Sequence, residues 1–149
     1  MNKIIFITGA TSGIGEAAAR LFAQAGDDLI LSGRRSERLL NLAKELEQTC
    51  GVEVRTLCFD IRDQIEVEKN IDGLTGKWKC IDVLINNAGL AAGLDKIQDG
   101  STDDWNTMID TNIKGFLYVA KAVSQGMVKQ GYGHIINMGS IAGKEVYEK

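Results

Sequence analysis

The chain has 149 residues, of which 44% are hydrophobic and 25% are charged, a balance typical of one globular domain rather than a disordered segment. Its net charge of −3 argues against a nucleic-acid-binding protein that relies on a basic face. No apolar run reaches the roughly 18 residues of a membrane helix, and the N-terminal run is too short for a secretory signal. We therefore expect a soluble, cytoplasmic protein with no nucleic-acid or membrane partner.

Strands and helices are expected to alternate along the chain, because short apolar runs alternate with amphipathic ones. In chain order the expected elements are a strand at 3–8, a helix at 14–25, a strand at 29–32, a helix at 36–50, a strand at 52–59, a helix at 63–74, a strand at 81–85, a loop at 86–100, a helical region at 101–130 and a strand at 134–138. Ser36 is an expected N-cap, as is Ser101 or Thr102, and the last helix is expected to break near Thr111.

Nearly continuous apolar strands between helices indicate a parallel sheet covered on both faces. Right-handed crossovers then favour an α/β fold with a doubly wound parallel sheet of the Rossmann type. The three cysteines, Cys50, Cys58 and Cys80, match neither a zinc site nor a CxxC pair, and His134 is the only histidine. The sequence therefore predicts reduced thiols and no metal site.

A glycine-rich loop, Thr8-Gly9-Ala10-Thr11-Ser12-Gly13-Ile14-Gly15, lies between the first expected strand and the first helix. Gly9 permits a tight turn, Gly13 lets the backbone approach a pyrophosphate, and Gly15 allows close helix packing, while free N–H groups of the first helical turn face the anion. The spacing is neither the usual GxGxxG nor a P-loop. The alternative is a glycine-rich turn without a ligand. The predicted contacts in this loop are Gly9, Thr11, Ser12, Gly13, Ile14 and Gly15.

The TGxxxGxG spacing of this loop resembles the short-chain dehydrogenase/reductase family. Asn86-Asn87-Ala88-Gly89, Asn112 and Ser140 follow in the order that the family shows, so the resemblance covers the whole chain. Within the family, residues 86–95, 105–115 and 139–147 look like the branch of serine and 3-hydroxy acid dehydrogenases. The resemblance implies that residues 1–149 form a dinucleotide-binding Rossmann domain.

Two arginines follow the second expected strand, where an NAD-binding protein usually carries Asp or Glu. Guanidinium groups bind a 2′-phosphate bidentately, so Arg34 and Arg35 predict NADP as the cofactor. The alternative is that these arginines are solvated charges, with Arg35 or Arg38 paired to Glu37 or Glu45.

Residues after the third and fourth strands complete the expected cofactor site. The resemblance implies that the Asp60 carboxylate meets the adenine amino group and that Ile61 flanks the ring; the alternative role for Asp60 is a helix cap. Asn86, Ala88 and Gly89 are expected to form a wall of the site, although the family role of Asn86 is partly structural.

Two catalytic residues are implied by the resemblance. Ser140 supplies a hydroxyl to the substrate oxygen, and Asn112 holds a water chain within its helix. The alternatives are a turn residue at the end of a strand for Ser140 and a helix-kink residue for Asn112.

The family's acid/base Tyr-x-x-x-Lys pair is absent from these 149 residues. Tyr147 follows Ser140 too closely, and Lys149 is only two residues beyond it, so we do not assign it the catalytic role. The family sheet continues with two further strands and the helix that carries Tyr and Lys. The sequence therefore looks like the first part of a longer protein, truncated after the fifth strand.

Truncation there is expected to leave an unprotected strand edge and an apolar helix face through Phe116, Val119 and Val123, which predicts a homo-oligomer. The first functional hypothesis is an oxidoreductase that transfers a hydride between NADP(H) and a small hydroxy acid or alcohol, or its carbonyl partner. The chain as given is expected to be inactive. The alternatives are a non-catalytic NADP(H)-binding module and a structural protein on a decayed fold.

Overall fold

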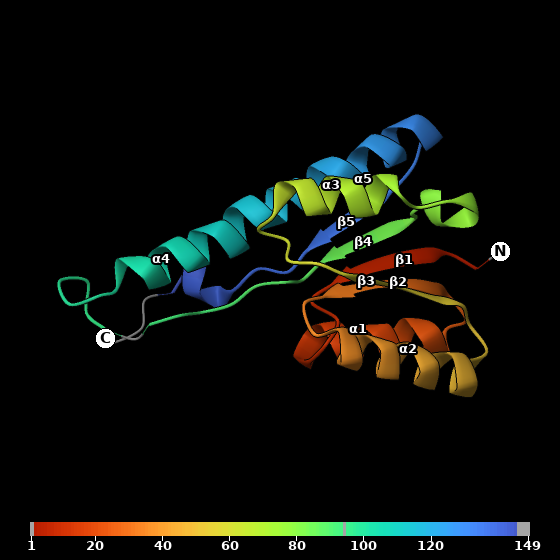
Figure 1. Cartoon of the computed structure of the whole chain (residues 1–149), viewed down its shortest axis with the longest axis horizontal. Helices are drawn as coiled ribbons and strands as arrows, with labels where there is room; N and C mark the ends of the chain where they lie inside the picture. Colours follow the sequence, from red (N-terminus) through yellow and green to blue (C-terminus); the bar gives the residue numbers. More distant parts are fainter. Residues whose placement is uncertain (1, 94, 146–149) are drawn as a thin grey trace.

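The computed structural model describes residues 2–93 and 95–145, so Tyr147 lies outside the described residues. Five strands form one parallel sheet in the order β3-β2-β1-β4-β5 (Figure 1). The strands are β1 (Ile4–Thr8), β2 (Asp28–Gly33), β3 (Val54–Cys58), β4 (Val83–Asn86) and β5 (His134–Asn137). The doubly wound α/β fold expected from the sequence is thereby confirmed.

Helices cover the two faces of the sheet, with α1 and α2 on one face and α3 and α5 on the other (Figure 1). The helices are α1 (Gly13–Gln24), α2 (Ser36–Cys50), α3 (Gln64–Asp72), α4 (Thr102–Ile109) and α5 (Phe116–Gln130). Short helical turns occupy η1 (Gly76–Lys79) and η3 (Ile141–Gly143), and a π-helical segment, η2 (Asp110–Gly115), joins α4 to α5. Within the described ranges no helix combines the length and apolar composition that crossing a bilayer requires.

The core follows the alternation of side chains along the strands. In β1, Ile5 and Ile7 belong to the buried cluster under α1 and α2, whereas Ile4 and Phe6 belong to the cluster under α3 and α5. The central strand β1 is therefore apolar on both faces, as a doubly covered parallel strand must be. Its neighbours β2 and β4 lie on opposite sides of it, so the chain crosses from one side to the other between β3 and β4.

Expected helix starts are confirmed in part. The Ser101 hydroxyl accepts a bond from the Asp104 N–H at 3.4 Å and caps α4, and the break expected near Thr111 is the π-helical segment η2. Ser36 is not a cap, because it is already the first helical residue and Arg35 occupies the N-cap position. Asp63 caps α3 by accepting the Glu66 N–H at 3.1 Å.

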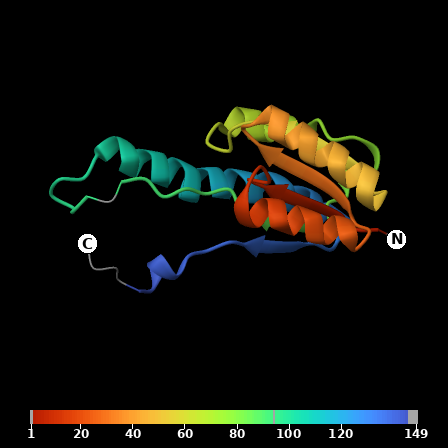
Figure 2. The ribbon, with the colours of Figure 1, turned by 90° about the horizontal axis from the view of Figure 1, so that it is seen from below.

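The face of α5 that was expected to be exposed and apolar is buried, and a different face of the helix is exposed. Val119 and Val123 are buried at 0% and 2% exposure, because their side of the helix packs into the core under α3 and the sheet. The exposed apolar side chains of this helical region are instead Ile109, Ile113 and Leu117, which recur at intervals of four residues, and Val128 near the end of α5. β5 lies at an edge of the sheet, as expected (Figure 2).

Candidate functional site

A cleft of about 470 Å³ opens where the parallel strands end at their carboxyl ends. Open α/β sheets bind ligands at this edge, beside the point where the strand order reverses. Of the residues predicted to bind the cofactor, Gly9, Thr11, Ser12, Ile14, Arg34, Arg35, Asp60, Ile61, Ala88 and Gly89 line this cleft. Residues that the sequence analysis did not assign also line it, namely Gly33, Phe59, Asn87, Leu90 and Thr111.

The glycine loop closes the cleft on the side of α1. Gly9 has φ +68° and Gly13 has φ +59°, a left-handed conformation that favours glycine. A Cβ on Gly15 would lie 2.5 Å from the Gly9 carbonyl oxygen, so Gly15 allows the close packing that the sequence predicted. Gly13 and Gly15 do not line the cleft; they shape the loop that does.

The N-terminus of α1 begins in this loop. The N-cap residue, Ser12, makes no side-chain bond to the first helical turn. The first N–H groups of a helix have no partner within the helix, and the helix dipole adds partial positive charge there. This end of the cleft is therefore suited to a phosphate or pyrophosphate.

The hydroxyl of Thr8 joins the loop after β1 to the loop after β4. Its Oγ1 accepts the N–H groups of Asn87 and Ala88, both at 2.9 Å. The Asn87 Nδ2 donates in return to the Thr8 carbonyl at 2.9 Å. Thr8 is completely buried and was not assigned from the sequence, although it is the first residue of the glycine motif. It fixes the cleft wall that Asn87 and Ala88 form.

Asn86 lies inside the fold and does not line the cleft, in keeping with the structural part of its expected role. It is fully buried, and its Nδ2 donates to the Phe116 carbonyl at 2.9 Å, which ties β4 to the start of α5. Its Oδ1 accepts from the Thr8 hydroxyl at 3.4 Å. The neighbouring Asn87 faces the cleft instead, because successive side chains of an extended chain point in opposite directions.

Arg35 is bound to the glycine loop. Its guanidinium donates to the Thr11 hydroxyl at 2.6 Å and 3.0 Å and to the Ser12 hydroxyl at 2.7 Å. Glu45 pairs with Arg20 instead. The alternative pairing of Arg35 with Glu37 or Glu45 is therefore wrong.

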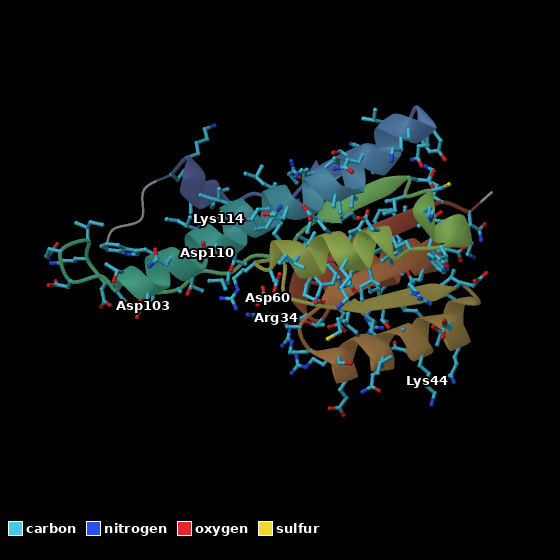
Figure 3. All side chains as sticks on the ribbon, turned by 45° about the horizontal axis from the view of Figure 1, so that its top comes forward. Arg34, Lys44, Asp60, Asp103, Asp110 and Lys114 are labelled. Atoms are coloured by element: carbon cyan, nitrogen blue, oxygen red, sulfur yellow. The ribbon has the colours of Figure 1, made fainter. Side chains whose placement is uncertain are left out.

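Arg34 lies beside Asp60 at the ends of β2 and β3 (Figure 3). The Arg34 Nη1 is 3.6 Å from the Asp60 Oδ2, whereas the Arg62 Nη2 is only 2.7 Å from the same oxygen. Burial raises the pKa of the Asp60 carboxyl, but hydrogen bonds from Arg62 and the charges of both arginines outweigh burial, so its pKa lies below the ordinary value. Asp60 does not cap α3, since Asp63 does.

The two predicted catalytic residues lie outside the cleft lining. Asn112, within η2, holds the loop after β4: its Nδ2 donates to the Leu90 carbonyl at 2.7 Å, and its Oδ1 accepts the Leu90 N–H at 2.9 Å. Ser140 is exposed, and its hydroxyl accepts the Ala142 N–H at 3.1 Å. It caps η3, three residues after the end of β5.

The π-helical segment η2 forms the wall opposite the glycine loop. A Cβ on Gly115 would lie 2.8 Å from the Ile61 Cγ1 and 2.9 Å from the Ile61 carbonyl oxygen, so the helix packs directly against the Ile61 backbone. Thr111 lines the cleft from the same segment. Its Oγ1 is buried and has no hydrogen-bond partner among the residues that the structure describes.

The family model for short chain dehydrogenases matches residues 3–149. The chain belongs to the short chain dehydrogenase family. The family resemblance expected from the sequence is thereby confirmed.

Two curated relatives illustrate the similarity. The NADP-dependent 3-hydroxy acid dehydrogenase YdfG of Salmonella typhi is 48% identical over 144 residues, which are 97% of this chain and 56% of that protein. Sulfoacetaldehyde reductase 2 of Chromohalobacter salexigens is 50% identical over 148 residues, which are 99% of this chain and 58% of that protein. The chain therefore spans little more than half the length of these relatives.

Solved structures of the family share the fold. The crystal structure of serine dehydrogenase from Escherichia coli matches with a TM-score of 0.90 and 45% identity, over 97% of this chain and 65% of that one. The closed form of serine dehydrogenase complexed with NADP+ matches with a TM-score of 0.89 and 44% identity, over 97% of this chain and 56% of that one.

The bonds of Thr8 lead to a stability prediction. Thr8→Val keeps the β-branched shape but leaves the N–H groups of Asn87 and Ala88 without an acceptor. An orphaned donor costs about 1–3 kcal/mol when it is buried, and these two donors are only partly buried. We therefore expect the free energy of unfolding to fall by about 2–4 kcal/mol. Urea denaturation followed by circular dichroism measures the change.

Two control variants separate the lost bonds from the substitution itself. Thr8→Ser keeps the acceptor and is expected to cost only about 1 kcal/mol for the buried methyl group. Thr56→Val makes the same exchange within β3 and is expected to stay within about 0.5 kcal/mol of the parent. Equal losses for Thr8→Val and Thr56→Val would show that the Thr8 hydroxyl does not support this wall.

Proposed function

We propose that this chain binds NADP(H) in the cleft and belongs to an oxidoreductase that transfers a hydride between NADP(H) and a small hydroxy acid or alcohol, or its carbonyl partner. The observation that carries the proposal is the pair Arg34 and Arg35 at the rim of the cleft, directly after β2. Relatives whose names state NADP dependence support it, as does the relative solved with NADP+.

The residues present fit such a cofactor. The glycine loop and the start of α1 would hold the pyrophosphate, the two arginines the 2′-phosphate, and the Asp60 and Ile61 wall the adenine ring. A bound nicotinamide ring supplies or accepts the hydride.

Ser140 and Asn112 are proposed to assist the substrate oxygen. The Ser140 hydroxyl would donate a hydrogen bond to that oxygen as negative charge develops, and Asn112 would order water beside it. Both side chains are already oriented by backbone partners, Ser140 by Ala142 and Asn112 by Leu90. Because the 149 residues contain no Tyr-x-x-x-Lys pair, they supply no phenol for proton transfer at the family spacing.

The first test is cofactor preference. We expect NADPH to bind at least about tenfold more tightly than NADH, a difference of about 1.4 kcal/mol, because two guanidinium groups are available to the 2′-phosphate. Arg34→Ala should reduce this difference, whereas Arg55→Ala, on an exposed position of β3, should not. Isothermal titration calorimetry measures the affinities, and equal values for the two cofactors in the parent chain would refute the proposal.

The second test is turnover. We expect the 149-residue chain to show no NADPH oxidation with small 3-oxo acids or aldehydes, since loss of general acid catalysis alone costs about 10²–10⁴-fold. A chain extended through a family Tyr-x-x-x-Lys segment should regain activity. The rate of NADPH oxidation by the two chains is compared from the absorbance of the reduced nicotinamide. Comparable turnover by both would mean that another group supplies the proton, and Tyr147 would be the first candidate to mutate.

A non-catalytic NADP(H)-binding module is the second candidate function. Retained NADP(H) affinity without turnover in the extended chain would support this module over the enzyme.

We also propose that copies of the chain associate. Ile113 and Leu117 are 54% and 59% exposed on one stripe of η2 and α5, and apolar surface of this kind favours a partner. Leu117→Glu is expected to reduce the oligomer measured by light scattering at tens of micromolar protein. Leu21→Glu, at a 67% exposed position of α1, is the matched control. A monomeric parent chain would exclude the association.

A further inference from the structure

Arg34 and Asp60 line the cleft, and Arg62 contacts Asp60 from outside that lining (Figure 3 labels Arg34 and Asp60). Both arginines approach the same carboxylate oxygen, the Asp60 Oδ2. Only the Arg62 contact, at 2.7 Å, is a hydrogen bond, because the 3.6 Å contact of Arg34 is beyond hydrogen-bond distance. Asp60 is therefore shared unequally between its two cationic neighbours.

Arg62 occupies both oxygens of the carboxylate. Its Nε lies 3.1 Å from Oδ1 and 3.0 Å from Oδ2, and its backbone N–H donates to Oδ1 at 3.0 Å. This arrangement combines a bidentate guanidinium pair with a local turn, since the two residues are only two positions apart. The Asp60 side chain is thus fixed by the segment that leads into α3.

Arg34 is correspondingly free. Its side chain is 60% exposed, against 37% for Arg62 and 28% for Asp60, and its attraction to Asp60 is a charge contact without a hydrogen bond. If Arg34 held a phosphate, only its guanidinium group would separate that phosphate from the Asp60 carboxylate. The Asp60 carboxylate would compete with the phosphate for Arg34 and would also repel the phosphate. The positive charge of Arg62 beside Asp60 reduces both effects.

We propose that Arg62 is a positioning residue for cofactor preference: by holding and neutralising Asp60, it leaves Arg34 available to the 2′-phosphate of NADP(H). This inference rests on the proposed function. It assigns to Arg62, which does not line the cleft, a role in choosing between cofactors. NAD(H) lacks the 2′-phosphate, so its binding is indifferent to the competition for Arg34.

The test compares the affinities of NADP+ and NAD+ by calorimetry in one buffer. In Arg62→Met, we expect the preference for NADP+ over NAD+ to fall about two- to fivefold, because an exposed charge contact of this kind is lost, while NAD+ affinity changes less than about twofold. Arg62→Lys keeps the charge and should retain most of the preference. Arg55→Met removes one positive charge from an exposed position of β3 and should leave the preference unchanged.

A double variant separates competition from a structural effect. In Asp60→Asn/Arg62→Met the competing carboxylate is gone, so the preference should return toward the parent value even if both affinities weaken. Equal weakening of NADP+ and NAD+ in Arg62→Met, or no recovery of the preference in the double variant, would overturn the inference. A parent chain that shows no preference for NADP+ would instead overturn the proposed function, and this inference with it.

Discussion

The close approach of the loops after β1 and β4 is the constraint on which the cleft depends. Parallel strands end at the same edge of a sheet, so the two loops meet there, and their backbones must pack without intervening side chains. A Cβ on Gly9 would lie 2.9 Å from the Ala88 Cα, and one on Gly15 would lie 2.6 Å from the Asn87 Nδ2. Thr8 supplies the acceptor that the crossing N–H groups need. This crossing places the start of α1 at the cleft.

The opposite wall depends on η2 in a similar way. The π-helical turn brings Gly115 against the Ile61 backbone and presents the Asn112 amide to both backbone groups of Leu90. π-Helical insertions frequently occur at functional sites, because they redirect side chains without ending the helix. Here one irregular turn determines the positions of two separate parts of the lining, the segment after β3 and the loop after β4.

The sequence predicted what local chemistry dictates. All five strands and the helices α1, α2 and α3 lie within two residues of their expected bounds, because apolar periodicity and turn residues specify them. The end of α5 at Gln130 is also as expected, but its start at Phe116 follows the expected break by five residues. Roles that depend on the packing of distant segments could not be predicted from the local sequence. Asn86 and Asn87 are identical neighbours, and only the direction of the strand end decides which one faces the cleft. Likewise α5 carries apolar residues on two stripes, and only contact with α3 and the sheet selects the one with Val119 for the core.

The two arginines after β2 show the same limit for charge. Their positive charge predicts that both arginines favour an anion. The position of an arginine in the sequence does not predict which residue its long side chain will contact. Arg35 bonds to two neutral hydroxyls, those of Thr11 and Ser12, so its positive charge is not cancelled by a carboxylate among these contacts. Arg34 lies beside the Asp60 carboxylate instead. An anion entering the cleft therefore meets in Arg35 a charge that is already oriented, and little side-chain entropy is lost in holding it.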